Sequence, residues 1–376
     1  MADFHFVTKR KKPEITLLLD IGTETVKALL FRKNGRKIDV LANSLEYFDR
    51  FGIFDSRDFE KDVMEHAILR TIRKLGSISN KAVALGLPAD ILKARIVSKE
   101  WKRPFVKKII TDTEKKSIYE KVITEAQKNI SSDFSLKTGI LANDLKFISL
   151  KILENKIEGY EVPTISKYEG QNLSFQILAT FLPNRYLEQI KNIIASLGLK
   201  VKEVVHEVEG LKSYFVQEND GIFIDMGGKI TQIFLVKRGI LEQVSDFPVG
   251  GETFSRAISD KLGLTEAESR VLKERYSKKE LSKESSDRIE EILQPAWQTW
   301  FENLKLKLEE MAIGYLPVGE IFIFGGASQL PNAEDIFKTK GRSIGSGFDS
   351  EVKILENGQE TPVLLKAHAC VEGDTV

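Results

Sequence analysis

Residues 221 to 234 read GIFIDMGGKITQIF and have a near-copy at residues 15 to 31, ITLLLDIGTETVKALLF. In each copy an apolar run ends in Asp-x-Gly, passes through a short polar turn and resumes as an alternating strand. A second turn with glycine follows each copy, at Gly35 and Gly239. The repeat predicts two matched β-hairpins in a duplicated α/β domain. The alternative is that they are unrelated hairpins of a mixed α/β chain.

Composition limits the classes of function. The chain has 376 residues, of which 42% are hydrophobic and 30% charged, with 56 basic and 55 acidic side chains. This balance gives no overall field that selects nucleic acid or a membrane. A single cysteine excludes an intramolecular disulfide, and the four histidines show no ligand spacing. The N-terminus lacks a signal-peptide pattern and no run is long enough to span a membrane, so we expect a cytoplasmic protein.

The segment between the hairpins predicts an insertion. A helical pattern at 63–75 and a strand ending at Pro88 are followed by about ninety residues with strand and helix patterns of their own. An amphipathic helix at 184–197 then leads back to the second hairpin. We therefore predict three units. The first lobe is formed by residues 13–88, 183–218 and 343–376. The inserted α/β subdomain is formed by 89–182, and the second lobe by 219–342.

A basic stretch marks the start of the insertion. From Lys93 to Lys116 there are nine basic and three acidic residues, with Trp101 and Phe105 among them. Such a surface could dock an acidic peptide, anionic lipid or nucleic acid. A solvated edge strand protected by lysines is an equal alternative. We favour a protein partner and expect no nucleic acid.

The two hairpins predict a phosphate-binding clamp. Small residues in a tight turn leave backbone N–H groups free to bind phosphate oxygens. An aspartate at the strand end, Asp20 or Asp225, would hold a hydrated divalent cation beside those phosphates. A third glycine turn, Gly325-Gly326, could approach the base and ribose. Together they indicate a nucleotide polyphosphate site between two lobes.

These motifs resemble those of the bacterial actin-like ATPases, most of all FtsA, with PilM as a near relative. LLLDIGTETVKAL is similar to the first phosphate loop, FIDMGGKITQI to the second and IFIFGGASQLP to the adenosine loop. The resemblance implies two ribonuclease-H-like lobes around a cleft for ATP and Mg²⁺, with the metal at Asp20 and Asp225. The implied nucleotide-binding residues are Asp20, Gly22, Thr23, Thr25, Lys27, Asp225, Gly227, Gly228, Lys229, Thr231, Gly325, Gly326 and Ser328.

The two families imply different roles. Likeness to FtsA implies an ATP-binding scaffold of cell division that forms filaments and ties the tubulin-like protein FtsZ to the cytoplasmic membrane. Likeness to PilM implies a cytoplasmic partner for the N-terminal tail of a membrane pilus-assembly protein, and Lys27 matches the PilM pattern better. Without a long amphipathic helix at its end, the chain would reach the inner face of the membrane only through a partner. A sugar or acetate kinase and a pseudo-ATPase are rival interpretations.

A departure from the family pattern in the second phosphate loop bears on catalysis. In the second loop Lys229 replaces a glycine, Ile230 a hydroxyl residue and Gln232 an acid. Lys229 either neutralises phosphate charge or fills the cradle. Glu209 falls where relatives carry an acid or amide that orients water; the alternative is a helix-cap carboxylate. We expect at most a slow, magnesium-dependent ATPase.

A second departure concerns the adenosine side. Relatives often place a Glu and a Lys one helical turn apart, whereas Glu268, Arg270 and Lys273 are off that spacing or of the wrong charge. Preference for adenine is therefore implied by the resemblance only.

Overall fold

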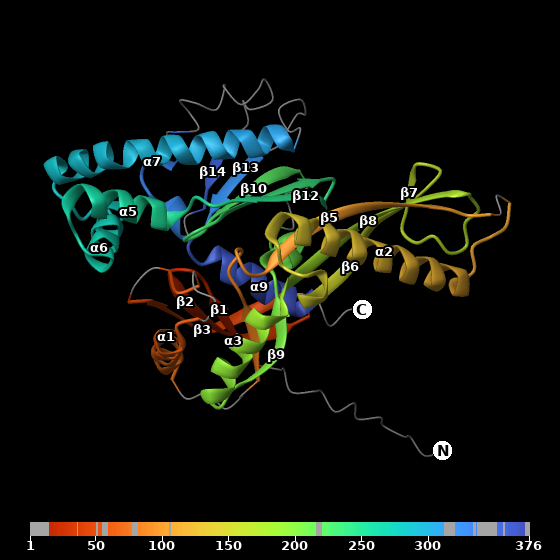
Figure 1. The fold of residues 1–376 in the computed structure, drawn as a ribbon, viewed down its shortest axis with the longest axis horizontal. Coiled ribbons are helices and arrows are strands. Elements are labelled where there is room, and N and C mark those ends of the chain that lie inside the picture. The colour runs from red at the N-terminus through yellow and green to blue at the C-terminus, as the bar shows by residue number, and fades with distance from the viewer. Residues whose placement is uncertain are drawn as a thin grey trace, which may run out of the picture.

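The computed structural model contains two five-stranded sheets and an inserted four-stranded sheet (Figure 1). It describes residues 15–35, 37–49, 52–54, 59–76, 82–104, 107–215, 220–311, 320–333, 336, 352–355 and 358–372. Phe105 and residues 343–351, which entered the predictions above, lie outside these ranges.

The first lobe is a five-stranded sheet. Its strands, in spatial order, are β3 (Lys37–Tyr47), β2 (Thr25–Asn34), β1 (Ile15–Ile21), β4 (Ala82–Gly86) and β9 (Lys200–Val205). β1 pairs antiparallel with β2 and parallel with β4. The first predicted hairpin is thus confirmed, and its first strand, β1, lies at the centre of the sheet.

Alternating leucines in β1 face two different cores. Leu17 and Leu19 face helices α1 (Lys61–Lys74) and α3 (Asn184–Ser196). Leu18 points to the opposite face, which is covered by helix α9 (Thr361–Glu372). Since successive residues of a strand point to opposite faces, the unbroken apolar run is the pattern expected of a central strand.

The second lobe repeats this topology. Its strands, in the corresponding order, are β12 (Ile240–Phe247), β11 (Thr231–Lys237), β10 (Gly221–Met226), β13 (Glu320–Phe324) and β14 (Val352–Ile354). β10 pairs antiparallel with β11 and parallel with β13, as β1 does with β2 and β4. The predicted duplication is confirmed by this shared order and direction of strands.

Helices cover one face of the second sheet. Ile222 and Ile224 of β10 pack with Trp297 and Trp300 of α7. The helices on this side are α5 (Gly251–Leu262), α6 (Glu266–Ser277) and α7 (Lys283–Glu310). Thr265 forms a capping box with Glu268 at the start of α6. The packing places the start of α5 beside the turn between β10 and β11.

One C-terminal strand departs from the predicted boundaries. We expected residues 343–376 in the first lobe, and α9 does pack on its sheet. β14, however, pairs in parallel with β13 of the second sheet. Val352 and Ile354 are apolar and pack against the second-lobe core, which accounts for this placement.

α9 lies between the two sheets (Figure 1). Val363 and Ala367 pack against the first sheet, whereas Leu365 belongs to a cluster with Phe223 and Phe324 of the second. α9 also contacts the short turn η2 (Glu207–Gly210), where a Cβ atom on Gly210 would overlap the carbonyl oxygen of Leu365. The helix is therefore fixed by both lobes at close range.

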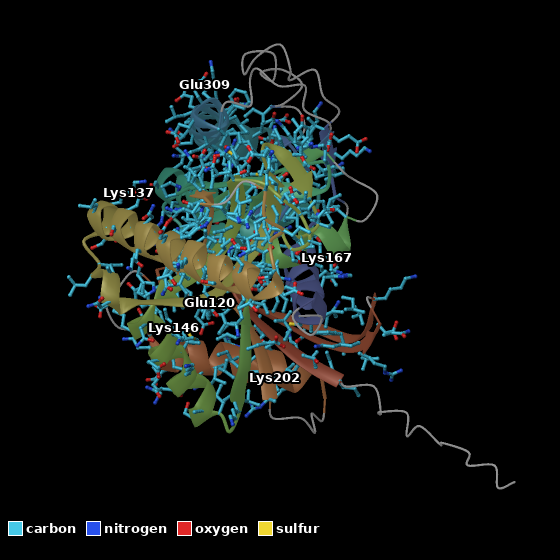
Figure 2. All side chains as sticks on the ribbon, turned by 90° about the vertical axis from the view of Figure 1, so that its right-hand side faces the viewer. Glu120, Lys137, Lys146, Lys167, Lys202 and Glu309 are labelled. Carbon is cyan, nitrogen blue, oxygen red and sulfur yellow. The ribbon has the colours of Figure 1, made fainter. Side chains whose placement is uncertain are left out.

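The insertion is an antiparallel sheet covered by one long helix. Its strands, in spatial order, are β5 (Lys93–Lys102), β8 (Asn172–Pro183), β6 (Leu145–Ile157) and β7 (Tyr160–Val162). Helix α2 (Asp112–Thr138) packs on it, and Figure 2 shows Glu120 and Lys137 along its outer surface. Thr111 caps α2 by accepting a hydrogen bond from the backbone N–H of Glu114.

Much of the predicted basic surface is used inside the molecule. Arg103 is buried and donates to both carboxylate oxygens of Glu114, at 2.8 and 3.0 Å. Lys93 and Arg95 of the edge strand β5 pair with Asp246 of β12, at 3.5 and 3.3 Å. Lys93 and Arg95 thus attach the insertion to the second lobe, and Arg103 is used within the insertion. These three of the nine basic residues are therefore removed from a free docking surface.

Among the residues that the structure describes, no helix is long and apolar enough to cross a membrane.

The Asp246 ion pairs predict an acid-sensitive contact between insertion and second lobe. Burial opposes ionisation of Asp246, but Lys93 and Arg95 outweigh it and lower the pKa of this carboxyl. A lowered pKa means that the pairs contribute stability above the ordinary aspartate pKa of about 4, and lose it as the pH falls through the folded-state pKa. We expect Asp246→Asn to reduce the free energy of unfolding by about 1 to 2 kcal/mol at pH 7.

Urea unfolding at pH 7 and at pH 3 measures this effect. The deficit of Asp246→Asn should be smaller at pH 3, because the carboxyl of the unfolded chain is then largely protonated and the stabilisation from the ion pairs has begun to fall. Asp133→Asn is the control, because Asp133 and its partner Lys137 are both exposed on α2. Equal deficits for the two variants at pH 7 would contradict the assignment.

Candidate functional site

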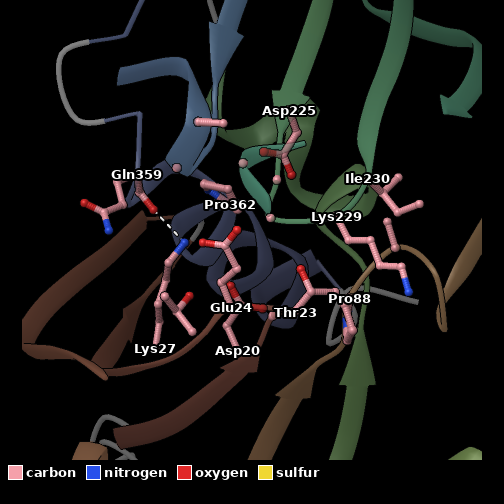
Figure 3. A pocket seen from close by; sticks show the side chains of 18 of the residues that line it. Asp20, Thr23, Glu24, Lys27, Pro88, Asp225, Lys229, Ile230, Gln359 and Pro362 are labelled. Atoms are coloured by element: carbon pink, nitrogen blue, oxygen red, sulfur yellow. Dashed lines mark hydrogen bonds between the residues drawn. The ribbon is translucent and has the colours of Figure 1, made fainter. Parts of the chain in front are cut away.

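The two β-hairpins and α9 enclose a cavity of about 400 Å³. Its walls come from the turns β1–β2 and β10–β11, from the segment after β4, from α6 and from η4 (Gly326–Gln329). Figure 3 shows Asp20 and Lys27 on one side and Asp225 on the other. The cavity lies between the lobes, where the sequence predicted a nucleotide site.

The two turns have the same hydrogen-bond geometry. The N–H of Gly22 donates to Thr25 O at 2.8 Å, and the N–H of Gly227 donates to Ile230 O at 3.1 Å. In the register of the flanking strands, Asp20 lies opposite Lys27, and Asp225 lies opposite Gln232. The repeat in the sequence is therefore a repeat of backbone geometry, and it places one aspartate at each end of the cavity.

The two turns touch each other. A Cβ atom on Gly228 would overlap the hydroxyl of Thr23 and lie 2.9 Å from Cγ of Glu24. Behind the second turn, the N–H groups of Gly251 and Glu252 at the start of α5 donate to the carbonyls of Gly227 and Gly228. The start of α5 thus holds the second turn against the first.

A buried lysine joins the acids at the floor of the cavity. Nζ of Lys366, on α9, lies 2.7 Å from Oδ1 of Asp20 and 3.0 Å from Oε2 of Glu207. The other oxygen of Glu207 accepts a hydrogen bond from Gln232. The resulting chain of polar contacts runs from the first sheet through α9 and η2 to the second sheet.

This cluster shifts the pKa values of its members. Burial alone would lower the pKa of Lys366, but Asp20 and Glu207 outweigh it and raise that pKa. Burial, reinforced by Glu207, raises the pKa of Asp225 well above its usual range. Burial lowers the pKa of Lys27, against the opposing pull of Asp20. The arrangement therefore favours a charged Lys366 and a neutral Asp225.

Lys27 extends from β2 toward the segment before α9. Its Nζ donates to Gln359 O at 2.7 Å, the contact drawn in Figure 3. On the other side of the cavity, Oδ1 of Asp225 is buried without a hydrogen-bond partner. A buried acceptor without a donor is costly, so this oxygen is a candidate to receive a hydrogen bond from a ligand.

A second ion pair crosses the cavity, on the side where the sequence predicted adenosine. Oε2 of Glu24, in the first turn, lies 3.5 Å from Nζ of Lys273 on α6, which also donates to Gly251 O. Lys273 lines the cavity with Glu274, Ser277 and Lys278. Arg270, one turn earlier, instead donates to Phe48 O at 2.6 Å. Of the residues weighed for the adenosine side, the structure places Lys273 at the cavity.

Lys229 does not strain the second turn. The non-glycine residues with positive φ in the described ranges are Glu158, Lys167, Arg238 and Lys279. Nζ of Lys229 lies 4.0 Å from Oδ2 of Asp90, and Figure 3 shows the side chain directed toward Pro88 and away from Asp225. Of the two alternatives for Lys229, the geometry favours a cation at the rim over a side chain that fills the cradle.

The cavity contains most of the predicted binding residues. Those that line it are Asp20, Gly22, Thr23, Thr25, Lys27, Asp225, Gly227, Gly228, Lys229 and Gly326. Thr231 instead donates to Val249 O at 2.6 Å and accepts from the Trp300 indole. Ser328 donates to the carbonyl of Gly325 at 2.8 Å. Thr231, Gly325 and Ser328 thus form the structure behind the cavity wall.

The predicted catalytic acid lies elsewhere. Glu209 pairs with Lys151 of the insertion at 2.6 Å and is not among the cavity residues. The acid of this turn that faces the cavity is Glu207, two positions earlier. The sequence could not separate them, because a single turn of η2 directs neighbouring acids to opposite sides.

Other cavity residues carried little or no sequence signal. Glu24 stands inside the first glycine turn, and an acid in a turn predicted to bind phosphate is a signal that marks it as a candidate cavity residue. Gln359 and Lys366 come from a segment about 340 residues away from Asp20 in sequence, with no motif around them. Only the packing of α9 brings Lys366 to the site.

The carboxylates do not fit the predicted magnesium ion as they are arranged. Asp20 is already paired with the ammonium group of Lys366, and the pKa of Asp225 is raised. In the part of the chain that the structure describes, no group of three or more His, Cys, Asp and Glu residues could hold a metal ion. A divalent cation at Asp20 would be repelled by the ammonium group of Lys366, which is paired with that carboxylate.

Comparison with known proteins adds a distant relative. No protein-family model matches the chain. The ethanolamine utilization protein EutJ of Salmonella typhimurium is 23% identical over 151 residues, which are 40% of this chain and 48% of that protein. The chain therefore spans about half the length of the curated relative it matches.

Solved structures match over nearly the whole chain. PilM in the PilM–PilN type IV pilus biogenesis complex is 16% identical, with 96% of this chain and 98% of that chain covered and a TM-score of 0.65. MreB5 of Spiroplasma citri bound to AMPPNP is 11% identical, with 97% and 99% covered and a TM-score of 0.50. At these identities the likeness shows the fold. The chain has the actin-like ATPase fold, as the resemblance of its hairpins implied.

Proposed function

We propose that this chain is a PilM-like scaffold that binds a nucleoside polyphosphate, of which ATP is the first candidate, between its two lobes. The bound nucleotide would fix the angle between the lobes, and a protein partner would bind the conformation so fixed. The observation that carries this proposal is the matched pair of turns at Gly22 and Gly227, which face one cavity from the two sheets. The same fold holds AMPPNP in MreB5, which supports a nucleotide as ligand.

A scaffold fits the site better than a metabolic enzyme. Rapid hydrolysis needs an acid or amide that is free to orient water. Both carboxylate oxygens of Glu207 are engaged, one with Gln232 and one with Lys366. A nucleotide held beside such a fixed acid would be hydrolysed slowly, which suits a conformational switch.

Pilus assembly is favoured over cell division for this chain. The match to PilM spans 98% of that structure, which was solved in a complex with PilN. The FtsA-like alternative, with an FtsZ-type partner, rests on the sequence motifs. In either role we propose a cytoplasmic protein at the inner face of the membrane, attached through its partner and able to associate with itself.

The first test is ATP binding. Isothermal titration calorimetry should give saturable binding of ATP to the natural chain at micromolar to millimolar Kd. Lys229→Gly should weaken binding by about 3- to 10-fold, because the rim cation near the phosphates is lost. Lys191→Gly, on the outer face of α3, is the control for removal of a lysine. Absence of binding at millimolar ATP would contradict the nucleotide site.

Glu24 gives a second prediction for the same cavity. Its carboxylate lies beside the two turns and is paired with Lys273. Glu24→Ser should tighten ATP binding by about 3- to 10-fold, because it frees Lys273 and removes a charge that repels phosphate. The measurement is the same titration, with Glu188→Ser on the surface of α3 as control. Weaker binding by Glu24→Ser would show that this carboxylate contacts the ligand favourably.

Partner choice separates the two candidate roles. Fluorescence anisotropy should detect binding of a labelled peptide with the N-terminal cytoplasmic sequence of the PilN-type protein from the same organism. Its affinity should change at least about threefold between the ATP-bound and nucleotide-free chain, as expected of coupled sites. A scrambled peptide is the control. Binding of an FtsZ-type protein, with none of the PilN-type peptide, would favour the division role.

A further inference from the structure

The floor of the cavity contains a cation that belongs to the chain itself. Nζ of Lys366 lies within 3.0 Å of one oxygen from Asp20 and one from Glu207, and its side chain is buried. We propose that this ammonium group takes the place of the divalent metal ion in the cleft, so that the chain binds a nucleotide polyphosphate without a metal. The part that concerns nucleotide rests on the function proposed above.

The surroundings of Lys366 are shaped to hold it. Its stem passes the end of β4, where a Cβ atom on Gly86 would lie 2.6 Å from Cδ of Lys366 and 2.9 Å from Oδ1 of Asp20. On the other side, α9 approaches Gly210 at backbone contact. Because the helix is fixed by both sheets, the ammonium group is held between Asp20 and Glu207 with little freedom to leave.

The charges around this point are consistent with one fixed cation. Asp20, on β1, and Glu207, on η2, both approach Nζ of Lys366. Lys27 and Asp225 are further titratable groups that interact with Lys366, and burial opposes the charged form of each. Burying the two carboxylates without a partner would be very unfavourable, and Lys366 neutralises them. A divalent ion here would have to displace the lysine or tolerate its charge.

A fixed ammonium can do part of what a metal does for a polyphosphate. It supplies a positive charge at a defined point beside the two turns, and it needs no ion from solution. It does not supply the Lewis acid that helps a phosphoryl group to transfer. Replacement of the metal ion by an ammonium group therefore preserves polyphosphate binding but not rapid phosphoryl transfer. This agrees with the engagement of both carboxylate oxygens of Glu207.

Manganese alone, without nucleotide, tests the inference directly. Electron paramagnetic resonance counts free Mn²⁺ in the presence of the natural chain, Lys366→Met, and the double variant Lys366→Met/Asp20→Asn. Lys366→Met should gain a Mn²⁺ site, so that its affinity for Mn²⁺ is at least about tenfold higher than the affinity of the natural chain for this ion. The double variant should lack this site. Lys33→Met is the matched control, because Lys33 also contacts α9, through Cys370 O at 2.8 Å, but does not line the cavity.

Thermal unfolding gives a second readout that does not require activity. Lys366→Met leaves two buried carboxylates unpaired, so it should melt at a lower temperature than the natural chain. Mn²⁺ should raise the melting temperature of this variant and leave those of the natural chain and Lys33→Met unchanged. If Lys366→Met is unfolded without metal, Lys366→Gln, which keeps a hydrogen-bond donor, takes its place in both measurements.

The outcomes separate this inference from the proposed function. A Mn²⁺ site in the natural chain that Asp20→Asn abolishes would overturn the inference, and so would failure of both Lys366 variants to gain a site. The Kd of the natural chain for ATP should differ by no more than about threefold between a buffer with EDTA and one with Mg²⁺. Binding only with Mg²⁺ would overturn the inference and leave the nucleotide site intact. No ATP binding, together with a gained Mn²⁺ site in Lys366→Met, would overturn only the nucleotide function.

Discussion

The buried contact of Lys366 with Asp20 and Glu207 is the constraint on which the cleft depends. Charged groups are tolerated inside a protein only when they are paired and hydrogen-bonded. Here the cation is on α9, one acid is in the first sheet, and the other is hydrogen-bonded to Gln232 of the second sheet. The charge balance of the cavity therefore depends on the position of α9 between the lobes, because α9 carries the lysine that neutralises both acids. A change in either disturbs the other.

This balance gives the cavity a mixed character. Five lysines line it, Lys27, Lys229, Lys273, Lys278 and Lys366, and so do five acids, Asp20, Glu24, Glu207, Asp225 and Glu274. Several of these groups are paired with one another, Glu24 with Lys273 and Asp20 with Lys366. A polyphosphate would therefore enter by exchanging one set of ion pairs for another. Such an exchange is a physical means by which ligand and lobe angle could be coupled.

The insertion is attached to both lobes. Lys93 and Arg95 of β5 pair with Asp246 of the second lobe, and Gln176 of β8 donates to Glu242 O at 3.1 Å. β8 ends where α3 of the first lobe begins, so the insertion is joined covalently to one lobe and by polar contacts to the other. A change in the angle between the lobes would alter the distances in these polar contacts. The affinity of a partner bound to the insertion could therefore depend on that angle.

The sequence by itself determined the repeated hairpins, the aspartates at their ends and the insertion between them. These features follow from local rules, since apolar alternation fixes strands and small residues fix tight turns, within about ten neighbouring residues. Tertiary structure alone decided that Glu207 and not Glu209 faces the cavity, that β14 joins the second sheet, and that Lys366 reaches Asp20. The physical reason is distance along the chain: Lys366 and Asp20 are 346 residues apart, and their meeting depends on how α9 packs between two sheets.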